Sequence, residues 1–227
     1  MRRSDWELMA PAGSEEALSA AIEGGADSVY FGVGRLNMRA HAAGNFRADD
    51  LPRVMDRCRA AGVNGYLTVN TVLYDEELAE MKDLMTAAAK ARVSAVIASD
   101  MAAVLAAREV GLPVHLSTQL NISNTEALAF YAQYAETAVL ARELNLNQVR
   151  CIADAVRDKP ILGTGGEAMR LEMFCHGALC MGISGRCWMS LHTRGKSANR
   201  GECLQNCRRT YNLVDRERGT ELALENG

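Results

Sequence analysis

The residues best suited to chemistry are cysteines gathered near the C-terminal end of the chain. Five of the seven cysteines lie between Cys175 and Cys207, and four of them follow the spacing C-x6-C-x15-C-x3-C. These four are Cys180, Cys187, Cys203 and Cys207. Soft thiolates gathered in this way favour zinc or an iron–sulfur cluster. The paired C-x2-C units of structural zinc sites are absent, so the spacing favours an iron–sulfur cluster over zinc and over unliganded buried thiols.

Strands and helices that alternate along the chain must position these residues. Short apolar segments that end in polar or small residues predict strands at 7–13, 28–33, 65–70, 95–99, 114–118, 137–142 and 171–176. The clearest helix lies between them at 76–92, where apolar residues recur at helical spacing and Asp75 is placed to cap the helix. The strands are apolar almost throughout, which is typical of a parallel sheet covered on both faces. Six strand–helix repeats predict an α/β protein.

Two α/β architectures are open, a doubly wound sheet and a barrel. No G-x-G-x-x-G follows the first strand and no P-loop occurs in the sequence, which argues against a nucleotide-binding open sheet. Polar residues close the strands, as in a barrel whose active site collects at the C-terminal strand ends. We predict a TIM-barrel-like (βα) fold over residues 1–177 and a Cys-rich segment over 178–227. Only seven strands are found and the tail from Tyr211 suggests a hairpin, so we expect an incomplete barrel whose eighth strand lies beyond residue 227.

Composition places few further limits on function. The 227 residues carry a net charge of −3, which does not indicate nucleic-acid binding by the chain as a whole. The Arg-rich tail between Arg186 and Arg218 is either a solvated surface or a phosphate-facing patch. No apolar run approaches the length of a membrane span, and the odd number of cysteines favours a reducing compartment. We therefore expect a cytoplasmic protein without a membrane partner.

The segment 172–190 carries a resemblance to a known family. It matches the pattern Glu-x-Phe-x-x-Gly, small, aliphatic, Cys, four residues, Gly-x-Cys, one residue, aliphatic, Ser. This pattern resembles the signature of the collagenase-like proteins of family 32 of the unclassified (U) peptidases. The segments 7–13, 25–32 and 197–212 are also similar to that family, so the resemblance covers essentially the whole chain.

The resemblance implies a function that the family name does not suggest. The chain is most similar to the branch of the family that hydroxylates C5 of a pyrimidine in tRNA or rRNA, with prephenate as the associated metabolite. Members of that branch carry a [4Fe-4S] cluster on a barrel-like scaffold. Carried over by position, the cluster ligands are Cys180, Cys187, Cys203 and Cys207. Cys58, Cys151 and Cys175 are then expected to be buried and outside the ligand set.

Two alternatives remain beside hydroxylation. The family name implies a collagenase-like peptidase, although the sequence contains neither H-E-x-x-H nor G-x-S-x-G. A non-catalytic, cluster-bearing subunit of a hydroxylation complex is the other alternative.

Side chains near the strand ends are candidates for binding and catalysis. Histidine can move protons near neutral pH, and arginine matches a carboxylate in bidentate geometry. Each also has an ordinary structural role, as a hydrogen-bonded core histidine or as an ion pair between Arg142 and Glu143. The predicted catalytic residues are His176, Glu172, Arg142 and His115, and the predicted substrate-binding residues are Arg39, Asn70 and Gln119.

Overall fold

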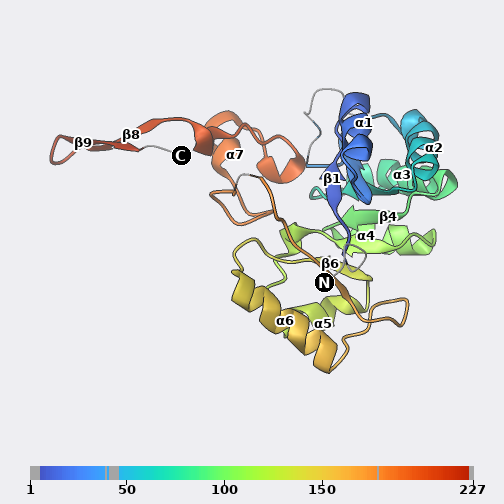
Figure 1. Ribbon diagram of the computed structural model, residues 1–227. Helices are drawn as coiled ribbons and strands as arrows, with labels where there is room; N and C mark the ends of the chain where they lie inside the picture. The colour runs from blue at the N-terminus through green and yellow to red at the C-terminus, as the bar shows by residue number, and fades with distance from the viewer. Residues whose placement is uncertain (1–5, 39, 41–45, 178, 225–227) are drawn as a thin grey trace.

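The computed structural model describes residues 6–38, 40, 46–177 and 179–224 (Figure 1). Six strand–helix repeats and a seventh strand make up most of the chain. The elements are β1 (Met9–Pro11), α1 (Glu15–Glu23), β2 (Ser28–Gly32), η2 (Ala48–Asp50), α2 (Leu51–Ala60), β3 (Asn64–Val69), η3 (Asp75–Glu77), α3 (Leu78–Ala91), β4 (Ala95–Ala98), α4 (Met101–Glu109), β5 (Val114–Leu116), η4 (Thr118–Leu120), α5 (Thr125–Ala132), β6 (Thr137–Val139), α6 (Leu146–Asp158) and β7 (Arg170–Glu172). The predicted α/β class and the seven predicted strands are confirmed.

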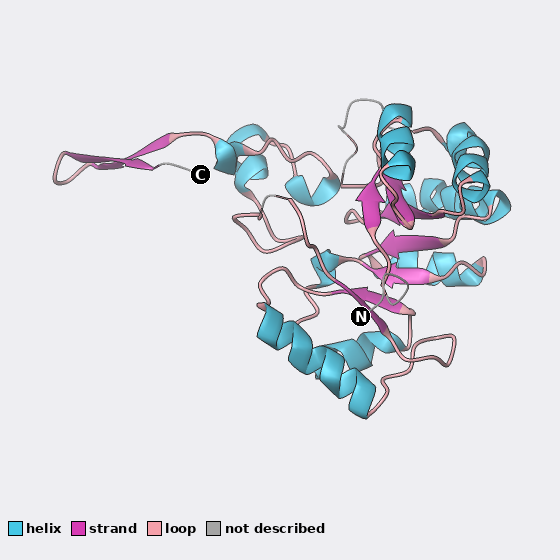
Figure 2. Ribbon diagram, in the orientation of Figure 1, coloured by secondary structure: helices cyan, strands magenta, loops and turns pink. Residues whose placement is uncertain are grey.

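The seven strands form one parallel sheet in the order β1-β2-β3-β4-β5-β6-β7. Each strand therefore pairs with its neighbours in sequence, and each helix crosses back over the same face of the sheet. The helices lie around the outside of the curved sheet (Figure 2). This arrangement is a half-barrel, with the C-terminal ends of all strands at one rim.

The two faces of the sheet differ in chemistry, because successive residues of a strand point to opposite faces. Outward residues such as Phe31, Leu67 and Leu116 are buried in the main apolar core with the helices. The inward face holds a much smaller apolar cluster of Tyr66, Ala95 and Ile97, packed by Met9 and Tyr30. The remaining inward positions are largely polar, and His115, Thr137 and Arg170 follow one another in register across β5, β6 and β7.

The predicted helix 76–92 begins differently from the sequence-based expectation. The 3-10 helix η3 comes first, and its cap position is Tyr74 rather than Asp75, so the predicted Asp75 cap is wrong. The Tyr74 backbone N–H donates to the Glu77 carboxylate at 2.9 Å. Glu77 thereby turns inward at the start of α3, where its side chain is buried.

A segment with little regular structure follows β7. It contains α7 (Met189–Arg194), η5 (Ala198–Arg200), η6 (Asn206–Arg208) and the strands β8 (Tyr211–Asp215) and β9 (Thr220–Leu224). The strands β8 and β9 pair antiparallel, which confirms the predicted hairpin. The hairpin extends away from the half-barrel (Figure 1). In the part of the chain that the structure describes, no helix is both long and apolar enough to span a membrane.

The packing of β5 against the helices leads to a stability prediction. Leu116 is fully buried, whereas Leu105 on α4 is 52% exposed. We expect Leu116→Ala to lower the free energy of unfolding by about 2–5 kcal/mol, because it leaves a cavity in a packed core. Leu105→Ala is the matched control and should change it by no more than about 0.5 kcal/mol. Urea denaturation of both variants checks this; equal losses would contradict the assignment of the outward face as the core.

Candidate functional site

A small cavity lies at the C-terminal ends of β3, β4 and β5. Its volume is about 150 Å³. The strand ends contribute Asn70, Ser99, Asp100 and Gln119, and the Cys-rich segment contributes Gly185 and Asn199. The C-terminal strand ends are where barrels of this kind place their active sites. The cavity therefore joins the predicted substrate-binding positions to the cysteine-bearing part of the chain.

The first attachment of the Cys-rich segment to the rim is at Ser184 and Gly185. Asn121 donates to the Ser184 carbonyl oxygen at 2.9 Å, and Arg142 Nε donates to Ser184 Oγ at 3.1 Å. Gly185 has φ of +72°, and a Cβ there would lie 2.9 Å from Cβ of Gln119. Only glycine fits this close approach without strain.

The second attachment is a buried carboxylate. Glu77 is 1% exposed and accepts hydrogen bonds from Arg200 at 2.6 and 2.8 Å and from Arg35 at 2.8 Å. The Arg200 guanidinium is the main reason that the pKa of Glu77 falls from 4.5 to about 2. Bidentate contact between Arg and carboxylate fixes orientation as well as distance. Arg200 belongs to η5, so this ion pair fastens the Cys-rich segment to the start of α3.

Contacts around this ion pair extend to Cys187. The Arg200 guanidinium lies 3.9 Å from the centre of the Tyr74 ring and donates to the Val72 carbonyl oxygen at 2.9 Å. The Val72 backbone N–H donates to the Asn199 carbonyl oxygen at 3.2 Å. Asn199 Oδ1 in turn accepts from the Cys187 backbone N–H at 3.2 Å. Cys187 is thus held beside the cavity that Asn199 lines.

The helix α7 gathers the segments that carry the other cysteines. It begins two residues after Cys187. The chain around Cys203 and Cys207 returns to it, because Leu204 N–H donates to Ser190 Oγ at 3.1 Å and Asn206 donates to Thr193 Oγ1 at 2.6 Å. Four soft thiolates are donors that an iron–sulfur cluster accepts. Within the described ranges, however, no group of three His, Cys, Asp or Glu side chains is placed to hold a metal ion. Ligation by Cys180, Cys187, Cys203 and Cys207 stays a prediction.

The three remaining cysteines are placed unevenly with respect to expectation. Cys58 is buried in α2, as predicted. Cys175 is exposed, because β7 ends at Glu172 and Cys175 lies in the loop that follows, so its predicted place on a strand is wrong. Cys151 is also exposed, on the outer side of α6.

A cluster of titratable side chains lies on the inward face of the half-barrel, below the cavity. Tyr66 donates its hydroxyl to Glu7 at 2.6 Å, and its ring centre lies 4.5 Å from that of His115. His115 Nδ1 lies 3.9 Å from Glu172 Oε2 and His115 Nε2 lies 3.5 Å from Arg170. His115 is buried, and its Nδ1 has no hydrogen-bond partner among the described residues. We call Glu7, Tyr66, His115, Arg170 and Glu172 the inward cluster.

Burial shifts the protonation of two members of the inward cluster in opposite directions. It raises the pKa of Glu172 to about 7, with the negative charge of Glu7 adding to the effect. It lowers the pKa of His115 to about 4, with the positive charge of Arg170 adding to the effect. Near neutral pH, a carboxyl group that can carry a proton thus faces a neutral imidazole. Two titratable groups with pKa values shifted in this way can act as proton donor and acceptor.

The structure brings together some predicted site residues and separates others. His115 and Glu172 meet in the inward cluster, and Asn70 and Gln119 line the cavity. The other predicted residues lie apart from both groups. Arg142 binds Ser184 and lies 5.7 Å from the Phe174 ring, His176 is exposed after β7, and Arg39 lies outside the described residues.

The sequence-based prediction missed Glu7, Tyr66 and Arg170. Glu7 and Arg170 stand at the starts of strands, whereas the prediction considered only strand ends. Tyr66 lies inside an apolar strand segment, and nothing local distinguishes it from a core residue. The alternation of residues along β3 and β7 is the signal that places Tyr66 and Arg170 on the same face as His115.

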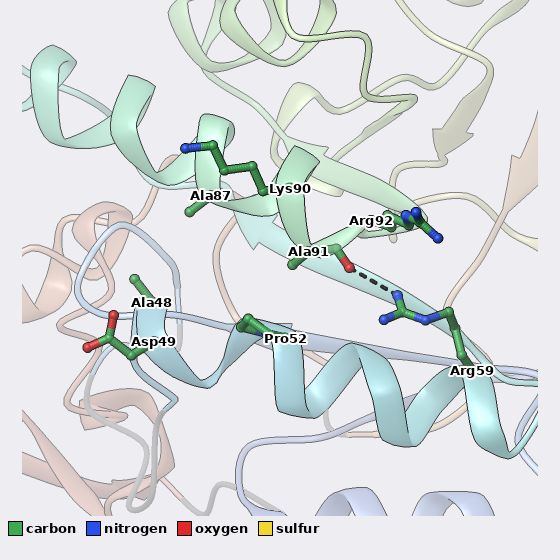
Figure 3. A pocket seen from close by; sticks show the side chains of 8 residues that line it. All are labelled: Ala48, Asp49, Pro52, Arg59, Ala87, Lys90, Ala91 and Arg92. Carbon is green, nitrogen blue, oxygen red and sulfur yellow. Dashed lines mark hydrogen bonds between the residues drawn. The ribbon is translucent and has the colours of Figure 1, made fainter.

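A larger hollow of about 520 Å³ lies on the outside of the sheet, between α2 and α3 (Figure 3). It is lined by Ala48, Asp49, Pro52, Arg59, Ala87, Lys90, Ala91 and Arg92. Arg59 donates to the Ala91 carbonyl oxygen at 3.0 Å and so satisfies the end of α3. Because this hollow is remote from the strand ends and the cysteines, we place the candidate site at the rim.

A half-barrel with a polar inward face and a Cys-rich segment fastened across its C-terminal rim defines a barrel-type protein with a rim-located site. The chain belongs to peptidase family U32, whose sequence profile matches residues 13–226. The predicted family is therefore confirmed. A solved structure of a U32 peptidase matches with a TM-score of 0.56 at 15% identity, covering 74% of this chain and 67% of that one, which supports the fold alone.

Curated relatives carry two kinds of name. A protein named collagenase from Porphyromonas gingivalis is 56% identical over 100% of this chain and 55% of its own length. The tRNA hydroxylation protein P1 of Bacillus subtilis is 32% identical over 96% of this chain and 50% of its own length. A 23S rRNA 5-hydroxycytidine synthase of Escherichia coli is 36% identical over 92% of this chain and 30% of its own length. The chain thus spans about half or less of the length of these relatives.

The buried carboxylate of Glu77 leads to a prediction about the Cys-rich segment. We expect Glu77→Gln to lower the free energy of unfolding by about 2 kcal/mol or more near neutral pH, because the arginines lose a buried charged partner. The variant should also expose residues 184–203 to hydrogen exchange. Since folding lowers the pKa of Glu77 from 4.5 to about 2, the stabilisation is complete above pH 4.5 and disappears as the pH falls toward 2.

Glu80→Gln is the matched control for this experiment, because Glu80 also pairs with Arg35 but is 50% exposed. Urea denaturation at several pH values and hydrogen exchange by mass spectrometry provide the measurements. An equal effect of both variants would show that Glu77 is an ordinary surface charge.

The inward cluster leads to a prediction about protonation. Arg170 lowers the pKa of both His115 and Glu172, so Arg170→Gln should raise both values. Titration of labelled histidine and glutamate side chains by NMR measures this. Arg194→Gln, at an exposed position on α7, should leave both values where they are. A change in one group alone would mean that Arg170 does not lie between them.

Proposed function

We propose that this chain is the barrel part of a protein that hydroxylates C5 of a pyrimidine in tRNA or rRNA. We further propose that Cys180, Cys187, Cys203 and Cys207 hold a [4Fe-4S] cluster and that prephenate is the associated metabolite. The observation that carries this proposal is the position of Cys187, whose backbone N–H binds Asn199 in the wall of the strand-end cavity. A redox group held at Cys187 would lie next to the place where a barrel binds its substrate.

Relatives support an RNA substrate. The proteins named for tRNA hydroxylation and for 5-hydroxycytidine synthesis match over 92–96% of this chain. The charge distribution agrees with a nucleic-acid partner. Residues 186–224 carry eight Lys or Arg against four Asp or Glu, a balance of +4 in a chain whose total is −3. Positive charge concentrated on the cysteine-bearing segment would attract the phosphate backbone of RNA.

The residues at the rim would divide the work among them. A base would enter the cavity lined by Asn70 and Gln119. Glu172 and His115 would hold and move a proton beneath it, since their pKa values lie on either side of neutral. Arg170, which is largely exposed on the inward face, would pair with a carboxylate of the metabolite. A bound iron–sulfur cluster would supply single-electron transfer, with a potential set by hydrogen bonds and burial.

A collagenase-like peptidase is the second candidate, favoured by the name of the 56% identical relative. A cysteine or serine peptidase needs a nucleophile within hydrogen-bonding reach of a base. His115, which is buried, contacts Tyr66, Arg170 and Glu172 in the described structure, and none of these is a hydroxyl or thiol nucleophile of that kind. The inward cluster therefore suits proton transfer better than acyl transfer.

Anaerobic purification followed by absorption spectroscopy and iron and sulfide analysis is the first test. We expect a broad band near ~400 nm and about four iron and four sulfide per chain, which Cys187→Ala should abolish. Cys151→Ala is the control, because Cys151 is exposed on a helix away from the segment, and it should retain the band. A colourless protein that contains zinc or no metal would remove the cluster from the proposal.

Activity separates hydroxylation from the two alternatives. RNA from cells that produce the protein, digested to nucleosides and analysed by mass spectrometry, should contain a hydroxylated pyrimidine that Glu172→Gln reduces at least about tenfold. Cleavage of denatured collagen by the purified protein, lost in His115→Gln, would favour the peptidase instead. Binding of RNA without modification would indicate a non-catalytic subunit.

A further inference from the structure

The cavity at the rim is lined by three carboxamide side chains, and the orientation of two of them is fixed. Asn70 Oδ1 accepts from the Met38 backbone N–H at 3.1 Å, and Asn199 Oδ1 accepts from the Cys187 backbone N–H at 3.2 Å. A backbone N–H can only donate, so the oxygen of each amide must face it. The amide nitrogens of Asn70 and Asn199 are therefore the groups left for the cavity.

Gln119 adds a third donor. Its Oε1 is hydrogen-bonded to Ser117 Oγ. The amide nitrogens of Asn70, Gln119 and Asn199 have no acceptor among the residues that the structure describes. Three unused NH₂ groups from β3, β5 and the Cys-rich segment thus surround one small space. An unused amide donor in a confined site is stabilised by a ligand that brings an acceptor.

Asp100 is the charged group of the cavity wall. Its Oδ2 accepts from the Leu73 backbone N–H at 3.1 Å and its Oδ1 from the Ala102 backbone N–H at 2.9 Å. A carboxylate offers about four lone-pair positions, so Asp100 can accept one further hydrogen bond. No Lys, Arg or His is found among the described residues that line the cavity. The site therefore offers several neutral donors and one anionic acceptor.

We propose that this cavity holds the pyrimidine base itself, reading its polar edge through the amides of Asn70, Gln119 and Asn199 and through Asp100. The inference rests on the proposed function and names the residues that recognise its substrate. Cytosine and uracil each present two acceptors and one N–H group along that edge. The acceptors match the amide donors and the N–H group matches Asp100.

Charge and size exclude the other small ligand of the proposed reaction from this cavity. A carboxylate metabolite is normally met by an arginine or another cation, and here it would lie beside the Asp100 carboxylate. A volume of about 150 Å³ is well below the ~300 Å³ of sites for drug-sized ligands, and suits a single small ring. Val72 and Leu120 supply apolar wall for the flat faces of that ring. The base would enter as an unstacked nucleotide, as in the recognition of single-stranded RNA.

Binding of nucleosides to the purified chain, measured by ligand-observed NMR, tests this proposal. Cytidine or uridine should bind, whereas adenosine and succinate should not. Asn70→Asp and Asn199→Asp keep the oxygen that accepts the backbone N–H but replace the cavity donor by a carboxylate oxygen. Each should weaken nucleoside binding by at least about tenfold, because a donor is lost and a repulsive acceptor gained.

Asn145→Asp is the matched control. Asn145 is the exposed N-cap of α6, a position where aspartate caps equally well, so nucleoside binding should be unchanged. Thermal unfolding verifies that each variant is folded, and Gln119→Glu replaces any that is not. Succinate binding without nucleoside binding, no binding of either pyrimidine nucleoside, or unchanged binding by the folded variants would each overturn the proposal.

The outcomes also separate this inference from the proposed function. Nucleoside binding that depends on Asn70 and Asn199, in a protein that hydroxylates no RNA, would support the base site and overturn the activity. RNA hydroxylation that persists in both aspartate variants would support the activity and overturn the base site.

Discussion

The arrangement of the site depends on the buried carboxylate of Glu77. A carboxylate that is 1% exposed is stable only with charged donors around it, and here Arg200 and Arg35 supply them. Because Glu77 starts α3 and Arg200 follows α7, one ion pair joins the half-barrel to the Cys-rich segment. The fastened segment places Gly185, Cys187 and Asn199 at the strand ends. Without this constraint, the cysteines and the cavity would have no fixed relation.

The polar inward face gives the half-barrel its chemical capacity. A barrel of this type is normally filled by branched apolar side chains, whereas here the centre contains Glu7, Tyr66, His115, Arg170 and Glu172. Desolvation moves the pKa of Glu172 up and that of His115 down, so both groups are poised for proton exchange near neutral pH. The stability of the fold comes instead from the outward face, where the strands pack against the helices.

Local patterns along the chain were sufficient for the architecture. The apolar runs and the helical spacing of 76–92 predict the strand–helix alternation, since each element must cover an apolar face of its neighbours. The hairpin from Tyr211 followed from turn residues between two short strands. Where prediction failed, long-range contacts decided. The Asp75 cap lost to Tyr74 because Glu77 is held by arginines distant in sequence, and Cys175 lies in an exposed loop because β7 ends three residues earlier.

The sequence by itself determined the family, the parallel strand order and the importance of the cysteine segment, because these follow from local periodicity and from a contiguous motif. It also indicated His115, Glu172, Asn70 and Gln119 as residues near strand ends. Only the tertiary structure decided which of them share a site. The register of β5 to β7 brought His115 to Glu172, and the segment folded back across the rim brought Asn199 to Asn70. Such meetings depend on strand register and chain reversal, which no local pattern encodes.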